Sequence, residues 1–319
     1  MVENILEAKN INLGFQSEEK FFQALYDVSF SLQKGKTLAL VGESGCGKTM
    51  SAMSILNLIP KSAKITSGEV IFNGENLLEK SQKEMSGIRG GKIALIPQDP
   101  MTSLNPLYTV GDQLLEVIKI HQNIYGDEAQ KKAIEAFEQV QIPDAKSRLK
   151  NYPHEFSGGM KQRAIIAMAL ACNAEIIIAD EPTTALDVTI QAQIMKLLKE
   201  IKENNQTSIL LITHDLALVS ENSDDVAVMY SGRIVEKASV DEFFSNTNHP
   251  YSRALLKSLP SNKKGRLETI KGQPPALNQI IDGCKFHPRC EFCMDRCSQS
   301  VPELVEIVKS HYSACFLNN

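Results

Sequence analysis

The chain has 319 residues, of which 43% are hydrophobic and 23% charged, and its formal net charge at pH 7 is −4. This composition excludes a disordered or fibrous chain and suits one main globular domain with an appendage. The negative net charge provides no general basic surface, so we expect no nucleic-acid partner.

The first ten residues, MVENILEAKN, contain acidic residues and lack the apolar core of a secretory signal. No apolar run reaches the ~18 residues that a membrane-spanning helix needs. We therefore expect a cytosolic protein without a membrane span. In that reducing compartment, clustered cysteines serve as metal ligands or redox thiols more often than as disulfides.

Two kinds of strand are predicted along the chain. Residues 4–40 contain short runs in which apolar and polar residues alternate, which indicates half-buried antiparallel strands. The runs TLALVG (37–42), EIIIAD (175–180) and SILLIT (208–213) are apolar throughout. Such runs are typical of strands covered on both faces in a parallel sheet.

Helical patterns lie between the buried strands, at 111–123, 127–141, 157–173 and 188–204. The alternation predicts an α/β domain, with a helical subdomain inserted over about 99–173. The polar segment SNKKGR follows the helical pattern of residues 249–260 and predicts a boundary. We therefore expect a main domain over 1–262 and a cysteine-rich extension over 263–319.

The octapeptide GESGCGKT (42–49) follows a buried strand and precedes a helical stretch, as a phosphate-binding loop requires. Its glycines allow backbone N–H groups to turn toward phosphate oxygens, and the helix adds its positive end. Lys48 is expected to reach the β- and γ-phosphates, and Thr49 to ligate Mg²⁺. The predicted nucleotide-binding residues of the loop are Gly42, Ser44, Gly45, Cys46, Gly47, Lys48 and Thr49.

Cys46 lies inside this loop, close to the start of the helix. The helix dipole favours a thiolate there, which predicts a thiol that reacts faster than an ordinary cysteine. The alternative is that cysteine occupies a position where a small residue such as serine also fits.

Polar residues at the ends of other strands complete a nucleotide site. Asp180 ends the strand of IIIADEP (176–182) and is expected in the Mg²⁺ shell, and the adjacent Glu181 is expected to be the general base. Gln98 ends KIALIPQ, where an amide orients water or Mg²⁺. His214 follows SILLIT, where an imidazole contacts the γ-phosphate. By themselves, a lone histidine such as His214 is more often structural, and a glutamine at a strand end such as Gln98 is usually incidental.

The segment EFSGGMKQR (155–163) places Ser157, Gly158 and Gly159 at the start of a helix. This helix N-terminus is a second site suited to an anion. One chain would not normally direct two such termini at one nucleotide.

In this order, the motifs resemble those of the ATP-binding subunits of ABC transporters. They are the Walker A loop at 42–49, the Q-loop at Gln98, the signature FSGGM, Walker B, the D-loop ALD (185–187) with Asp187, and the switch His214. The resemblance implies that two subunits pair head to tail, so that each signature serves the partner's ATP. Met160 stands where the family has glutamine. We expect function to persist because the family's phosphate contact uses Ser157 and the glycine amides.

The family also stacks an aromatic side chain on adenine. Phe15, at the end of NINLGF, is the first candidate, and Phe22 and Tyr26 are alternatives.

Three further stretches are similar to importers of dipeptides, oligopeptides or nickel: IPQDPMTSLNPLYTVGDQL (96–114), HPYSRALLKSLP (249–260) and GQPPAL (272–277). The resemblance implies a peripheral protein at the cytoplasmic face of the cell membrane. Its helical subdomain would bind permease subunits beside a second homologous ATPase or a copy of itself. An extracytoplasmic binding protein would select the substrate. Peptides are favoured over nickel, and a non-transport ABC ATPase is a further alternative.

Five of the seven cysteines lie in the last 36 residues. Five thiols exceed the four that a closed metal site needs, and only one C-x2-C pair is present. In the peptide-importer family, a similar tail is associated with a [4Fe–4S] cluster, and the matching positions are Cys284, Cys290, Cys297 and Cys315. Cys293 is a spare thiol or displaces a neighbour as ligand. The alternatives are zinc, with His287 and His311 available, and a tail without metal. A segment this short needs a staple to fold.

Overall fold

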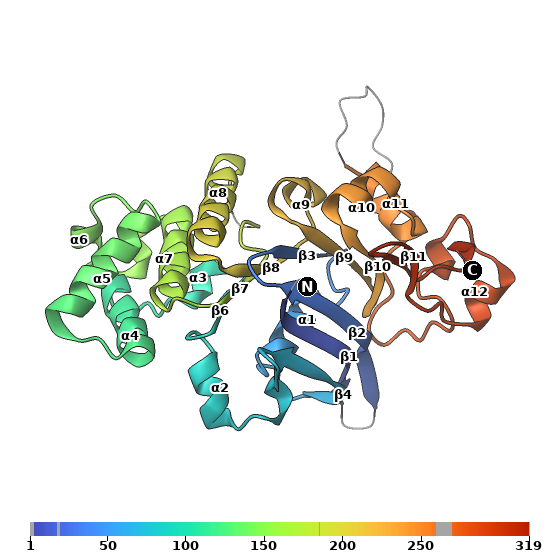
Figure 1. Cartoon of the computed structure of the whole chain (residues 1–319), viewed down its shortest axis with the longest axis horizontal. Coiled ribbons are helices and arrows are strands. Elements are labelled where there is room, and N and C mark those ends of the chain that lie inside the picture. Colours follow the sequence, from blue (N-terminus) through green and yellow to red (C-terminus); the bar gives the residue numbers. More distant parts are fainter. Residues whose placement is uncertain (1–2, 18–19, 185, 260–269, 319) are drawn as a thin grey trace. The chain divides into compact units, whose positions relative to one another are not determined.

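The computed structural model (Figure 1) describes residues 3–17, 20–184, 186–259 and 270–318. The chain forms two compact units. Unit 1 comprises Met1–Glu79 and Ile212–Asn319, and unit 2 comprises Lys80–Leu211. The expected boundary in SNKKGR lies outside the described residues.

Unit 1 contains the predicted antiparallel strands. They form a sheet in the order β2-β1-β4-β5. The bounds are β1 (Asn4–Gln16), β2 (Phe21–Gln33), β4 (Ala63–Phe72) and β5 (Glu75–Asn76), followed by a 3-10 turn at Leu77–Glu79. The alternation of the sequence explains the sheet, because side chains along a strand point to opposite faces. Leu6, Leu13 and Leu25 are buried.

A second group of strands in unit 1 begins with the buried β3 (Thr37–Val41), which pairs in parallel with β9 (Asp225–Tyr230). β10 (Arg233–Ser239), β12 (His311–Ser313) and β11 (Val305–Val308) follow it in antiparallel order. The chain's last strands thus extend the sheet that begins next to the phosphate loop. The helices of unit 1 are α1 (Lys48–Ile55), α9 (Leu216–Asn222), α10 (Val240–Asn246), α11 (Pro250–Lys257) and α12 (Asp295–Gln299).

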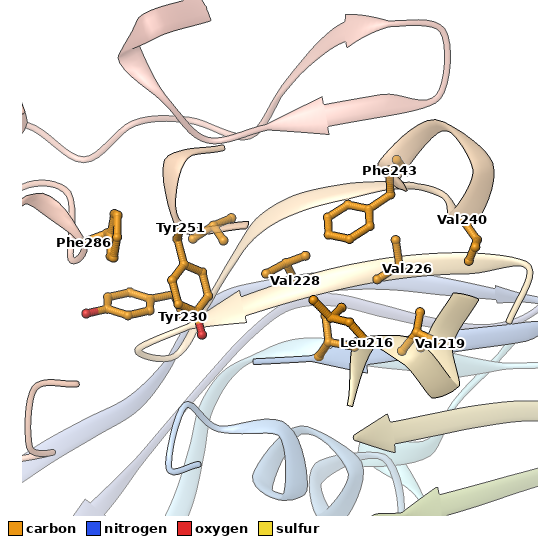
Figure 2. Close-up of a cluster of buried hydrophobic side chains, with 13 residues drawn as sticks. Leu216, Val219, Val226, Val228, Tyr230, Val240, Phe243, Tyr251 and Phe286 are labelled. Carbon is orange, nitrogen blue, oxygen red and sulfur yellow. The ribbon is translucent and has the colours of Figure 1, made fainter. Parts of the chain in front are cut away.

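The core beside β9 joins early and late parts of the sequence. Val226 and Val228 of β9 pack with α9 and α10, and Figure 2 shows Tyr230, Tyr251 and Phe286 grouped at one end of this cluster. The Phe286 ring lies 5.2 Å from the Tyr230 ring and 5.3 Å from the Tyr251 ring, measured between centroids. The cysteine-rich segment is therefore attached to unit 1 by apolar packing as well as by β12.

Unit 2 contains a parallel pair of strands and most of the helices. β6 (Ile93–Ile96) and β7 (Ile176–Asp180) pair from Ile93↔Ile176 to Ile96↔Ala179. The helices and 3-10 turn are α2 (Gln82–Ile88), α3 (Pro100–Ser103), α4 (Val110–Gln122), α5 (Gly126–Gln139), α6 (Ala145–Arg148), η2 (Pro153–Glu155), α7 (Gly158–Ala171) and α8 (Val188–Asn205). The four helices expected from periodicity are α4, α5, α7 and α8.

β8 (Ser208–Thr213) begins in unit 2 and ends in unit 1. All of its residues are buried, as its apolar sequence predicts. Across the helices of the part of the chain that is described, none has the length and apolar character needed to cross a bilayer.

Candidate active site

The phosphate loop of unit 1 has the backbone that its glycines predict. A Cβ atom on Gly42 would lie 2.2 Å from the carbonyl oxygen of Met229, so only glycine fits there. Gly47 has φ of +110° and forms the N-cap of α1. No atom of the described residues lies within 4 Å of a Cβ built on Gly45, so this side of the loop faces open space.

Lys48 is buried, and its ammonium donates hydrogen bonds to backbone carbonyl oxygens of the same loop. Its Nζ donates to the carbonyl oxygens of Gly42 (2.7 Å) and Glu43 (3.1 Å). Ser44 and Thr49 are exposed. The loop is thus formed around its lysine, with hydroxyl-bearing residues on the accessible side.

Cys46 differs from the sequence-based expectation. The residue is 5% exposed, and burial raises the pKa of its thiol more than Lys48 lowers it. The raised pKa disagrees with the expectation of a favoured thiolate, because desolvation outweighs the effect of the Lys48 ammonium. The alternative explanation, that Cys46 occupies a tight position where a small residue is required, agrees better with its burial.

In unit 2, the register of the parallel strands brings two predicted residues together. Gln98 follows β6 and Glu181 follows β7, at the same edge of the pair. The Gln98 Nε2 donates to Glu181 Oε2 at 3.1 Å, and the Thr184 Oγ1 donates to the same oxygen at 2.8 Å. Asp180, at the end of β7, is buried. The arrangement holds one carboxylate in a fixed orientation at the carboxyl end of a strand.

Thr184 is a contact that sequence reasoning missed. A signal was present, since the residue follows Walker B as DEPTT, three positions after Glu181. A threonine at that spacing can bond back to the acid when the chain turns, and Glu181 has φ of 46°, in the left-handed region.

The signature forms the start of α7. Ser157 is the N-cap, and its hydroxyl accepts from the Met160 N–H at 3.3 Å. A Cβ on Gly159 would lie 2.9 Å from Ile190 Cγ2, which explains that glycine by packing. Asp187 caps α8 by accepting from the Ile190 N–H at 3.0 Å. Ala185 of the D-loop lies outside the described residues.

His214 is exposed and directly follows β8. It belongs to unit 1 with the phosphate loop, whereas Gln98, Asp180, Glu181 and the signature belong to unit 2. Their convergence on one nucleotide stays a prediction from the sequence.

The aromatic candidates for adenine differ in their surroundings. Phe15 is half-buried and faces Phe22 in the register of β1 and β2. Tyr26 lies under two cations, the Arg233 guanidinium at 5.1 Å and the Lys285 ammonium at 4.8 Å from the ring centroid. Its ring is thus already engaged, while the assignment of Phe15 or Phe22 stays a prediction.

Four of the clustered thiols line one cavity in unit 1. The cavity is bounded by Cys284, Cys290, Cys297 and Cys315, together with His249, His287, Phe286, Phe292 and Met294 among others. Cys293 is exposed and does not line it. Burial, with smaller effects of the neighbouring thiols, raises the pKa of Cys284 to about 11. Among the residues with described positions, no three His, Cys, Asp or Glu side chains are arranged to hold a single metal ion.

The two histidines considered for zinc lie in different places. His287 lines the cavity, and its Nδ1 lies 3.0 Å from the Cys284 carbonyl oxygen. His311 is buried away from the cavity lining, with Nε2 2.8 Å from Glu236 Oε1 and Nδ1 3.3 Å from Glu242 Oε1.

Two family models match the chain. The model described as ABC transporter matches residues 25–184, and the model described as oligopeptide/dipeptide transporter, C-terminal region, matches residues 235–297. The second match includes the first four clustered cysteines.

Curated relatives match over nearly the whole chain. A probable peptide ABC transporter ATP-binding protein, y4tR of Sinorhizobium fredii, is 50% identical and covers 99% of this chain and 95% of its own. The dipeptide transport ATP-binding protein DppD of Bacillus subtilis is 46% identical and covers 100% and 96%. The oligopeptide transport ATP-binding protein OppD of the same species is 45% identical and covers 99% and 89%.

Among solved structures, the dimeric ATP-binding cassette MJ0796 bound to ADP and phosphate matches with a TM-score of 0.66 at 28% identity. The match covers 74% of this chain and 98% of that one. The cassette cbiO1 from Clostridium perfringens matches with a TM-score of 0.65 at 26% identity, covering 76% and 92%.

Proposed function

Since the chain belongs to the ATP-binding subunits of dipeptide and oligopeptide ABC transporters, we propose that its ATP hydrolysis powers the import of short peptides through a membrane permease. The relatives cited above are named for peptide, dipeptide and oligopeptide transport, which supports peptides over nickel. The similarity over the whole length of transporter subunits also favours transport over a non-transport role.

We infer the hydrolytic roles from the residues of each unit taken by itself. In unit 1, Lys48 would exchange the carbonyl oxygens of Gly42 and Glu43 for phosphate oxygens. In unit 2, Glu181 would accept the proton of the attacking water, held in orientation by Gln98 and Thr184. The bond from Gln98 to Glu181 is the observation that carries this proposal, because it brings the Q-loop and Walker B together.

The residues proposed to hold Mg²⁺ have suitable donor chemistry. They are Thr49, Gln98 and Asp180, whose hydroxyl, amide and carboxylate oxygens are ligands that Mg²⁺ prefers. When bound, the ion would neutralise charge that develops on the phosphates. His214 would contact the γ-phosphate, and Phe15 would stack on adenine.

The proposed partners follow from surfaces that the site leaves open. The N-terminus of α7, formed by Ser157, Gly158 and Gly159, is suited to bind an anion. The anion would be a phosphate of ATP bound to a second ATPase subunit or to a copy of this chain. Met101, Leu107 and Tyr108 in the helical part of unit 2 are 56%, 80% and 56% exposed, which supports permease docking there. We place the protein at the cytoplasmic face of the membrane, with an extracytoplasmic protein selecting the substrate.

For the tail, we propose a [4Fe–4S] cluster held by Cys284, Cys290, Cys297 and Cys315. The support is that all four thiols line one cavity, while Cys293 is exposed outside it. Thiolates are the ligands that iron–sulfur clusters use, and a bound cluster would supply folding energy to a short segment. Zinc is the competing metal, and of the two histidines considered for it, His287 lines the cavity.

Colour and metal content separate these tail proposals. Protein purified without oxygen should be brown and contain iron and sulfide in equal amounts. Cys290→Ser should bleach it, whereas the matched Cys293→Ser variant should stay coloured. Colourless protein with one zinc per chain would reject the cluster and retain a structural metal.

Transport can be tested in a strain that lacks this protein, by measuring uptake of a labelled dipeptide, a longer peptide and nickel. Wild-type protein should restore peptide uptake, and Lys48→Ala should not. Restoration of nickel uptake alone would reject the peptide proposal in favour of the nickel alternative.

A further inference from the structure

An arginine from the cysteine-rich segment contacts the phosphate loop. Arg289 lies directly before Cys290, and its Nη1 and Nη2 donate to the two carboxylate oxygens of Glu43 at 2.6 and 3.0 Å. The two residues are 246 positions apart in sequence but both belong to unit 1. Such a bidentate pair fixes distance and orientation together.

The guanidinium has no spare hydrogen-bond donor. Its remaining N–H groups donate to the carbonyl oxygens of Lys271 (2.9 Å) and Gly272 (3.3 Å) and to the Tyr230 hydroxyl (3.3 Å). The Arg289 side chain is 6% exposed and that of Glu43 is 24% exposed. A guanidinium supplies five N–H donors in a planar fork, and here all five are used, so lysine cannot reproduce the arrangement.

Glu43 links Arg289 to the nucleotide-binding Lys48, because its carboxylate contacts the one and its carbonyl oxygen contacts the other. Its carboxylate is held by Arg289, its N–H donates to the Tyr251 hydroxyl at 2.9 Å, and its carbonyl accepts from Lys48 at 3.1 Å and from the Cys46 N–H at 3.3 Å. Tyr251 in turn packs on Phe286, three positions before Arg289. The first turn of the loop is therefore anchored from one side by the late segment of the chain.

Charge gives the contact a consequence for the ligand. Glu43 is the one acidic residue of GESGCGKT, a loop whose ligand is a triphosphate. An unneutralised carboxylate in the loop would repel the phosphates over several ångströms, and this repulsion is screened only in part near a protein surface. The Arg289 guanidinium that pairs with Glu43 is positively charged, as arginine is throughout the accessible pH range.

We propose that Arg289 is a positioning residue for nucleotide binding: it neutralises Glu43 and holds the first turn of the phosphate loop in place for the nucleotide. This rests on the phosphate-loop assignment of the proposed function. The cysteine-rich segment is then part of the nucleotide-binding apparatus without touching the nucleotide.

The test is binding of a fluorescent ADP analogue with Mg²⁺ to the full chain. Arg289→Gln should raise the dissociation constant roughly tenfold, because it leaves Glu43 charged and unpaired beside the phosphates. The double variant Glu43→Gln/Arg289→Gln should return to within about threefold of wild type, since no unpaired charge remains. The defect of Arg289→Gln should shrink as salt is raised.

Two controls keep the outcomes distinct. Lys271→Gln removes a positive charge from an exposed ion pair with Glu291 (2.9 Å) in the same segment, and should leave binding unchanged. Lys48→Ala tests the phosphate loop itself: retained binding in that variant would reject the proposed function. Circular dichroism at the temperature of the binding measurement shows that each variant is folded.

Wild-type affinity in Arg289→Gln would overturn the positioning role. Equal weakening in the single and double variants would overturn the charge argument, because a merely structural anchor is lost in both. The charge argument would also be overturned if the loss of affinity in Arg289→Gln did not change with salt concentration.

Discussion

Replacing Glu181 by glutamine tests the centre of the proposed mechanism. Glu181 Oε2 accepts from Gln98 and Thr184, and an amide keeps one carbonyl oxygen able to accept both bonds. The substitution therefore preserves shape and hydrogen bonding but removes the base. We expect nucleotide binding to be retained and turnover to be lost.

The size of the expected fall in kcat follows from the role of Glu181 as general base. A positioned general base contributes roughly 10²–10⁴-fold to a rate, so kcat should fall by that factor, equal to about 2.7–5.4 kcal/mol in the barrier. KM should change little, because binding in the ground state depends on the loop of unit 1. Thr184→Val, which removes only one hydrogen bond to the carboxylate, should cost on the order of tenfold in kcat.

The assay is Mg²⁺-dependent phosphate release, measured beside binding of a fluorescent nucleotide. The comparison requires that the variant still binds. Hydrolysis within about threefold of wild type, or loss of binding together with activity, would refute the assignment of Glu181 as base. A larger loss for Thr184→Val than for Glu181→Gln would also contradict it.

Three further outcomes are expected. Gly42→Ala should abolish nucleotide binding because its Cβ would meet a carbonyl oxygen of β9 at 2.2 Å; a titration with labelled nucleotide checks this, and circular dichroism shows that the variant is folded. Phe286→Ala should lower the free energy of unfolding by about 3–5 kcal/mol, measured by urea unfolding with circular dichroism, and a change below 1 kcal/mol would deny it a core role. At pH 8, Cys46 should be labelled by a thiol reagent more slowly than Cys293, because the Cys46 side chain is buried and that of Cys293 is exposed; faster labelling of Cys46 would restore the expectation of a reactive thiol.

The elements and motifs around the site were predictable because they depend on local pattern. Buried strands such as β3 and β7 are continuous apolar runs, and helices such as α5 follow the 3.6-residue period. The meeting of Gln98 with Glu181 was implied by their places at the ends of parallel strands. The three-residue spacing in DEPTT allows the bond from Thr184 to Glu181, but the bond also depends on the backbone turn at Glu181, which the spacing alone does not fix.

The surroundings of the tail were not predictable for a different reason. β12 is a three-residue strand that pairs with β10, which ends over 70 residues earlier, and so short a run carries no periodic signal. Cys46 shows the same limit at short range. Its place beside a helix end is visible in the sequence, but the burial that dominates its pKa is a tertiary property.

The cysteine-rich segment near the end of the chain is attached to the rest of unit 1 by contacts that do not involve its thiols. Cys284 and Cys290 enclose a short stretch containing Phe286, which packs on Tyr251, and Arg289, which pairs with Glu43. Two independent forces, apolar burial and a bidentate ion pair, thus hold this stretch against the nucleotide-binding unit before any metal is considered. A metal bound by the cysteines at either end would restrain the same stretch from outside. The stretch between Cys284 and Cys290 therefore supports the phosphate loop directly, rather than forming a separate appendage that depends on a metal alone for its attachment.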